Sequence, residues 1–160
     1  MALVWSDFAE IAGSASGALT GLLFVAVSLN RERVTRHPGL RSQAGQTLVL
    51  FLLALITSLV LVIPGTPSWA LGLELVVVAV VSGVAMGMIS QRKRPEDGDQ
   101  PEDLLAQLLD RVSPNLLTML LILVAGCIEL AGADGLYVLA PAIILALGNG
   151  VVNAWLFLTE

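Results

Sequence analysis

The stretch TLVLFLLALITSLVLVI, residues 47–63, decides the fold of this chain. It contains no charged residue, and most of its side chains are large and aliphatic. A helix rises about 1.5 Å per residue, so about 20 such residues cross the hydrocarbon core of a bilayer. The rest of the chain has the same character, because 56% of its 160 residues are hydrophobic and only 13% are charged. The sequence therefore predicts an integral membrane protein that contacts the lipid bilayer.

Four more apolar blocks flank this stretch, and charged residues, proline and glycine separate them. Their unbroken length favours helices as the spanning elements. The last two blocks are joined only by the turn GADG at residues 132–135, and together they would exceed the thickness of a membrane. We predict an all-α, polytopic transmembrane helical bundle in which residues 1–160 form a single domain. The five predicted spans are residues 8–30, 44–63, 69–90, 114–131 and 136–158.

Basic residues occur in two of the segments between spans and nowhere else. The first segment contains Arg31, Arg33, Arg36 and Arg41, and the second contains Arg92, Lys93, Arg94 and Arg111. Basic segments resist translocation and favour the cytoplasm. With five spans, this pattern predicts an N-terminus outside and a C-terminus in the cytoplasm.

Residues 91–113 are predicted to form a cytoplasmic linker. The linker begins with a charged, proline-interrupted stretch and continues as EDLLAQLLDRV, residues 102–112, in which the leucines fall on one side of a helix. This pattern predicts an amphipathic helix that lies on the inner leaflet. The alternative is a helix that binds a cytoplasmic protein partner.

Three glutamates, Glu10, Glu74 and Glu129, are predicted to lie at one depth near the outer ends of their spans. No Lys, Arg or His occurs at that depth. Glutamates that face protein there need a proton, a cation or hydrogen bonds, which makes them a candidate cation or proton site, or a pore mouth. Two other interpretations stay open: solvated carboxylates at the headgroup level, and hydrogen-bonded glutamates that hold helices together.

Small residues form a stripe on the first span. Gly13, Gly17 and Gly21 share one helical face, which Phe24 and Ser28 continue. Such stripes let helices approach closely in lipid, and they recur in the third and last spans. We predict a homo-oligomer, with packing inside one protomer as the alternative. The recurring small residues are Ala79, Gly83 and Gly87, and Ala142, Ala146, Gly150 and Ala154.

The first and last spans are the polar ones. Asn149 and Asn153 lie one turn apart on one face of the last span, where amides need a partner or a polar path. We therefore expect the first and last spans to lie in the interior or at a subunit interface. The aliphatic span 44–63 is expected to face lipid.

Several classes of function lack their usual residues. The single cysteine, Cys127, permits no intrachain disulfide and no paired-cysteine metal site, and the single histidine, His37, lies in a loop. No nucleophilic serine motif or phosphate-binding glycine loop occurs. We expect no enzymatic activity, no metal or cofactor, and no nucleic-acid binding, since the loop arginines suit lipid headgroups.

The sequence FAEIAGSASGALTGLLFVAVSLN, residues 8–30, is followed by HPGL at residues 37–40. These stretches resemble a family of small, uncharacterised, multi-spanning membrane proteins of bacteria, actinobacterial by their residue usage. The resemblance covers mainly the first two spans. It implies a bacterial inner-membrane location and no particular activity.

Two classes of function remain. The first is an oligomeric channel for inorganic cations, in which the first span, with or without the last, lines the pathway and the glutamates form its outer mouth. The second is a non-conducting accessory or scaffold subunit that docks on a larger membrane complex. A proton-coupled transporter is disfavoured, because the five spans contain no detectable inverted repeat.

Overall fold

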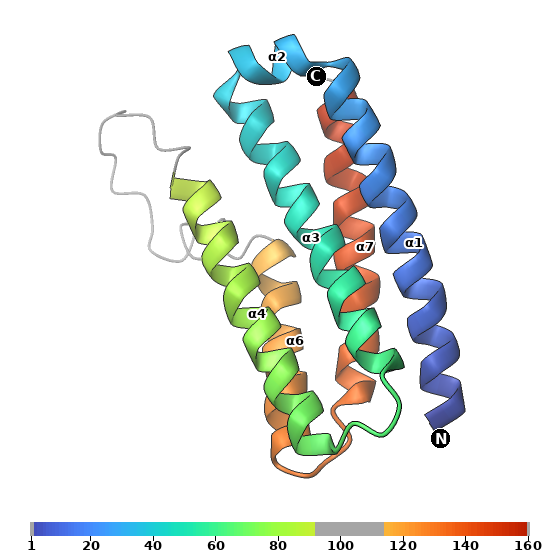
Figure 1. The fold of residues 1–160 in the computed structure, drawn as a ribbon. Coiled ribbons are helices and arrows are strands. Elements are labelled where there is room, and N and C mark those ends of the chain that lie inside the picture. The colour runs from blue at the N-terminus through green and yellow to red at the C-terminus, as the bar shows by residue number, and fades with distance from the viewer. Residues whose placement is uncertain (1, 92–113, 160) are drawn as a thin grey trace.

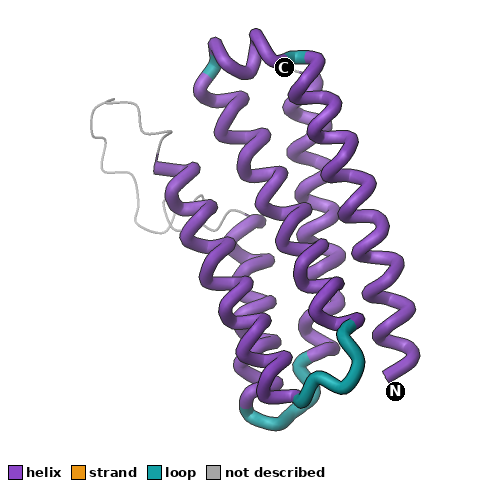
Figure 2. The backbone as a smooth tube through the Cα atoms, in the orientation of Figure 1, coloured by secondary structure: helices purple, strands orange, loops and turns teal. Residues whose placement is uncertain are grey.

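The computed structural model describes residues 2–91 and 114–159, nearly all of which are helical, with short turns between the helices (Figure 2). No strand occurs within these two ranges, so the predicted all-α fold is confirmed for them. The predicted amphipathic helix within residues 102–112 lies outside the described residues. The helices are α1 (Ala2–Leu29), α2 (Arg31–Arg36), α3 (Pro38–Val62), α4 (Ser68–Gln91), α6 (Pro114–Leu130) and α7 (Leu136–Thr159).

Four of these helices are long and apolar enough to cross a membrane: α1, α3, α4 and α7. They support the prediction of a multi-pass membrane protein. Helix α6 is equally apolar but has only 17 residues, which corresponds to a length of about 25 Å. It begins part-way along the bundle beside α4 (Figure 1). A fifth crossing by residues 114–131 therefore stays a prediction.

The helices form an up-and-down bundle with the two ends of the chain at opposite ends of it (Figure 1). The N-terminus lies beside the α3–α4 connection and the α6–α7 turn, and we call this end the N-terminal end. Helix α2 and the C-terminus lie at the other end, which we call the α2 end. Helix α3 contacts α1, α4 and α7, while α4 packs mainly on α6 and α1 mainly on α3.

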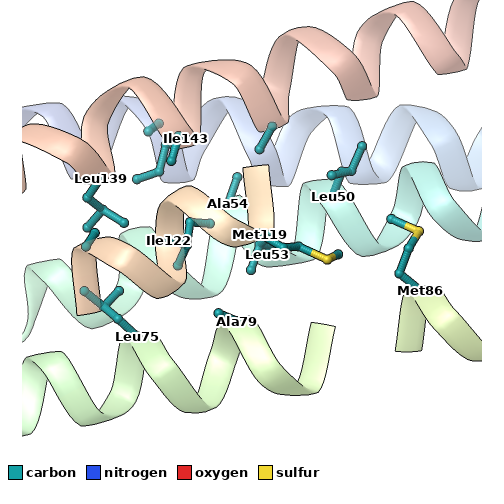
Figure 3. Packing of buried hydrophobic residues seen from close by; sticks show 14 residues of the cluster. Leu50, Leu53, Ala54, Leu75, Ala79, Met86, Met119, Ile122, Leu139 and Ile143 are labelled. Carbon is teal, nitrogen blue, oxygen red and sulfur yellow. The ribbon is translucent and has the colours of Figure 1, made fainter. Parts of the chain in front are cut away.

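The hydrophobic core lies among α3, α4, α6 and α7. Fully buried side chains from all four helices meet there, among them Leu53, Leu75, Ile122 and Ile143 (Figure 3). Helix α1 contributes only Ala12 to the buried part of this cluster. The first helix is thus an outer member of the bundle, attached to α3.

This arrangement corrects one expectation. The aliphatic span 44–63, expected to face lipid, belongs to the most buried of the four long apolar helices, because 39% of the apolar stretch of α3 is buried, against 17% of that of α1. Of the two positions expected for the first span, the interior of the protomer does not fit α1, and a subunit interface stays a prediction. In lipid, large aliphatic side chains suit a protein core and the membrane equally well, so composition does not distinguish the two.

Close helix contacts use two of the three predicted small-residue faces inside the protomer. Ala142 and Ala146 of α7 are fully buried, and Gly150 lies against the ring of Phe51. On α4, Ala79 is buried and Gly83 lies near the sulfur of Met119. These faces of α7, and of α4 as far as Gly83, therefore pack within one protomer, whereas a Cβ atom at the exposed Gly87 of α4 would meet nothing within 4 Å.

Candidate functional site

Helix α1 keeps most of its small-residue stripe free of contacts. A Cβ atom at Gly13 would lie 3.2 Å from the Cβ atom of Ser58, so this glycine packs on α3. At Gly17 and Gly21 a Cβ atom would meet nothing within 4 Å. The stripe therefore divides: its first glycine serves the protomer, and the other two face outward.

The outward part of the stripe belongs to a longer row of residues. Glu10, Ser14, Gly17, Gly21, Phe24 and Ser28 are all exposed. At about 100° per residue, they lie within about 40° of one line along α1. We call these six residues the outward row. It runs from the N-terminal end of the bundle almost to α2 and is polar or small except at Phe24.

Hydroxyl groups elsewhere on α1 are already bound to its backbone. Ser16 donates a hydrogen bond to the carbonyl oxygen of Ala12 at 2.7 Å, and Thr20 donates to that of Ser16 at 2.8 Å. Within the described part of the chain, Ser14 and Ser28 make no hydrogen bond through their side chains. The outward row thus holds the hydroxyls of α1 that remain available to water or to another helix.

The three predicted glutamates have different surroundings. Glu10 is exposed on α1, Glu74 is half-buried on α4, and Glu129 is buried on α6 with only 6% of its surface exposed. Among the described residues, no three acidic, histidine or cysteine side chains come together in a way that could hold a metal ion. A ring of these carboxylates would therefore need more than one copy of the chain.

Glu129 stabilises the turn between α6 and α7. Its Oε1 atom accepts a hydrogen bond from the backbone N–H of Gly135 at 2.9 Å. Gly132 in the same turn has a φ of +78°, which glycine adopts without strain, and Gly135 lies against the carbonyl of Ala125. Within one protomer, Glu129 matches the interpretation of a hydrogen-bonded glutamate that holds helices together.

Four buried polar atoms lack a hydrogen-bond partner within the described residues: Thr57 Oγ1, Ser58 Oγ, Glu74 Oε2 and Asn149 Nδ2. Thr57 and Glu74 each lie within about two helical turns of the α3–α4 connection, at 3.6 residues per turn. Leaving such an atom unpaired costs about 1–3 kcal/mol. These four atoms are the buried polar groups of the protomer that the described contacts leave unpaired.

Sequence reasoning missed Thr57 and Ser58. The signal was present, because they are two adjacent hydroxyl residues in an otherwise aliphatic run. Asn149 and Asn153 of α7 are both half-buried, so neither lies on a fully exposed face.

Comparison of the chain with protein-family models, curated proteins and solved structures finds no match. The resemblance of residues 8–40 to small actinobacterial membrane proteins therefore stays a prediction.

Proposed function

We propose that this protein is a homo-oligomeric channel for inorganic cations in the bacterial cytoplasmic membrane, with the outward row of α1 lining the shared pathway. One observation carries the proposal: α1, the least covered spanning helix, presents a row of residues, polar or small except at Phe24, that nothing in the described part of the protomer covers.

A carboxylate and hydroxyls on a spanning helix are costly in contact with lipid tails. Such groups normally face a bundle interior or a water-filled cavity. Because Glu10, Ser14 and Ser28 are exposed in the protomer, an oligomer supplies the polar surroundings that they need. Gly17 and Gly21 leave space beside the α1 backbone, either for water or for the close approach of another helix.

The arrangement of the helices supports the proposed orientation. We count α6 as one of five crossings, which agrees with the positions of the two chain ends at opposite ends of the bundle (Figure 1). Arg31, Arg33 and Arg36 belong to α2 and Arg41 to the first turn of α3, so all four lie at the α2 end. Placing that end in the cytoplasm satisfies the preference of basic residues and puts Glu10 at the outer surface.

Each part of the outward row then has a role in conduction. A ring of Glu10 carboxylates at the outer mouth raises the local concentration of cations. Ser14 continues the polar lining, and Gly17 and Gly21 let neighbouring copies of α1 approach closely around the pathway. Phe24, with 60% of its surface exposed, narrows the pathway toward the cytoplasm.

Potassium efflux from liposomes that contain the purified protein tests this function. We expect efflux with the native chain and several-fold slower efflux with Glu10→Gln. The difference should be largest at low ionic strength, because salt screens the field of exposed carboxylates. Glu74→Gln is the matched control, because it removes the same charge from a half-buried position outside the row.

Three outcomes would contradict the proposal. Absence of efflux rules out conduction under these conditions. Efflux that is indifferent to Glu10→Gln rules out the carboxylate ring. Efflux that is lost with Glu74→Gln but not with Glu10→Gln assigns the pathway to the interior of the protomer.

A second function, that of a non-conducting scaffold subunit, is favoured by the bare backbone at Gly17 and Gly21. Two helices that pack tightly through such glycines form a sealed contact without a lumen. In that case the protein would still be an oligomer, or would dock on another membrane protein, and liposomes would show no efflux.

A further inference from the structure

A pocket of about 370 Å³ lies at the α2 end of the bundle, between the last turns of α1, helix α2 and the first turns of α3. Helix α2 crosses there from the end of α1 to the start of α3 (Figure 1). The wall of the pocket is built on a small separate core, in which Val34 of α2 and Ala44 of α3 are buried. Leu23 of α1 is buried beside them.

The pocket combines an apolar wall with two guanidinium groups. Arg31 and Arg41 both line it, and no acidic residue does so among the described residues. The nearby Glu32 instead pairs with Arg36 at 3.6 Å. Within the described ranges, neither Arg31 nor Arg41 has an ion-pair partner. Two exposed positive charges therefore border an apolar pocket with nothing described there to neutralise them.

The pocket also spans the boundary between the membrane core and its surface. The apolar stretch of α1 ends at Leu29 and that of α3 begins at Gly39. Phe24 and Leu48 line the pocket from within these stretches, whereas Arg31 lines it from the polar segment between them. This is the depth at which lipid phosphates meet the acyl chains.

We propose that this pocket binds one anionic phospholipid of the adjacent leaflet. Arg31 and Arg41 would hold its phosphate, because guanidinium groups match phosphate oxygens in two-pronged hydrogen bonds. One acyl chain would lie along Val27 and Leu48. An ammonium headgroup would find no carboxylate among the lining residues, so the site favours anionic over zwitterionic lipids.

Lipid retention during detergent purification tests the site. The chain is mixed with phosphatidylglycerol or phosphatidylcholine, and bound lipid is counted by native mass spectrometry. We expect phosphatidylglycerol to bind, and Arg31→Gln with Arg41→Gln to weaken its binding about tenfold or more, as loss of charged hydrogen bonds predicts. Arg33→Gln with Arg36→Gln is the control, because it removes the same charge from residues of α2 that do not line the pocket.

A second variant distinguishes lipid binding in the pocket from attraction of the lipid by the arginine charges alone. Leu48→Trp fills the apolar part and leaves every arginine in place, so it should also reduce phosphatidylglycerol binding. Inorganic phosphate at millimolar concentration should not displace the lipid, because it lacks the acyl chain. The proposal would be overturned if phosphatidylglycerol and phosphatidylcholine bind equally well. It would also be overturned if both double arginine variants lose the same amount of bound phosphatidylglycerol, or if Leu48→Trp binds this lipid as well as the native chain does. If the variant with Arg31→Gln and Arg41→Gln does not fold, lipid binding by Leu48→Trp decides whether the proposal holds.

Discussion

At Gly72 and Gly126 the backbones of α4 and α6 approach so closely that neither position has room for a side chain. A Cβ atom at Gly72 would lie 2.8 Å from the carbonyl oxygen of Gly126 and 2.8 Å from the backbone nitrogen of Leu130. Both neighbours are backbone atoms, which cannot move aside as the end of a flexible side chain can. This contact joins the short helix α6 to the rest of the bundle.

We therefore expect Gly72→Ala to destabilise the protein by about 1–3 kcal/mol, as overpacking does in other close contacts. The measurement is denaturant unfolding in detergent micelles. Gly148→Ala serves as the control, since a Cβ atom there meets nothing within 4 Å and alanine favours helices by up to about 1 kcal/mol. Equal stability of the two variants would show that α4 and α6 are not in this close contact.

At the scale of elements, α1 and α3 exchange the places that their compositions predict. The polar, glycine-rich helix is the outer one, and the aliphatic helix is central. Helix α3 occupies the centre because small and hydroxyl residues on it, among them Ala54, Thr57 and Ser58, are buried at helical spacing. The remaining polar face of α1 is then left for another molecule.

The exposed polar face of α1 leads to a prediction about the oligomeric state of the protein. Gly17→Leu should shift the protein to a smaller oligomer, because leucine fills the space that a close helix contact needs. Light scattering of the protein in detergent measures the mass of the oligomer. Gly148→Leu, at another exposed glycine without neighbours in the protomer, should leave the mass unchanged. Identical masses for native, Gly17→Leu and Gly148→Leu would show that the outward row forms no subunit contact.

At the scale of the whole molecule, the sequence predicts where helices run better than which faces they cover. The predicted spans 114–131 and 136–158 match α6 (Pro114–Leu130) and α7 (Leu136–Thr159) closely, because charge, proline and glycine mark their ends. The first span was expected to begin at Phe8, but α1 begins at Ala2, since a charged residue near a helix end is tolerated. The arginine-rich segment after α1 forms α2, where a loop was expected.

The sequence does not predict which parts of the chain, far apart in sequence, contact one another. The shared position of Glu10, Glu74 and Glu129 near one end follows from counting residues along helices, yet their burial depends on the neighbours of each helix. Hydrophobicity does not specify those neighbours in a membrane, because lipid tails are as apolar as leucine. The pocket beside Arg31 and Arg41 depends on the fold of α2 over α3, which no pattern in the segment predicted.

The central claim is that the outward row of α1 faces the same helix of another copy, and cysteine cross-linking in membranes tests it most directly. In a Cys127→Ser background, which removes the only native thiol, Ser14→Cys places one thiol in the row. Leu73→Cys places one on an exposed position of α4 near the same end of the bundle. On mild oxidation we predict a disulfide-linked dimer from Ser14→Cys and little or none from Leu73→Cys. No dimer from Ser14→Cys, or equal amounts from both variants, would contradict the account.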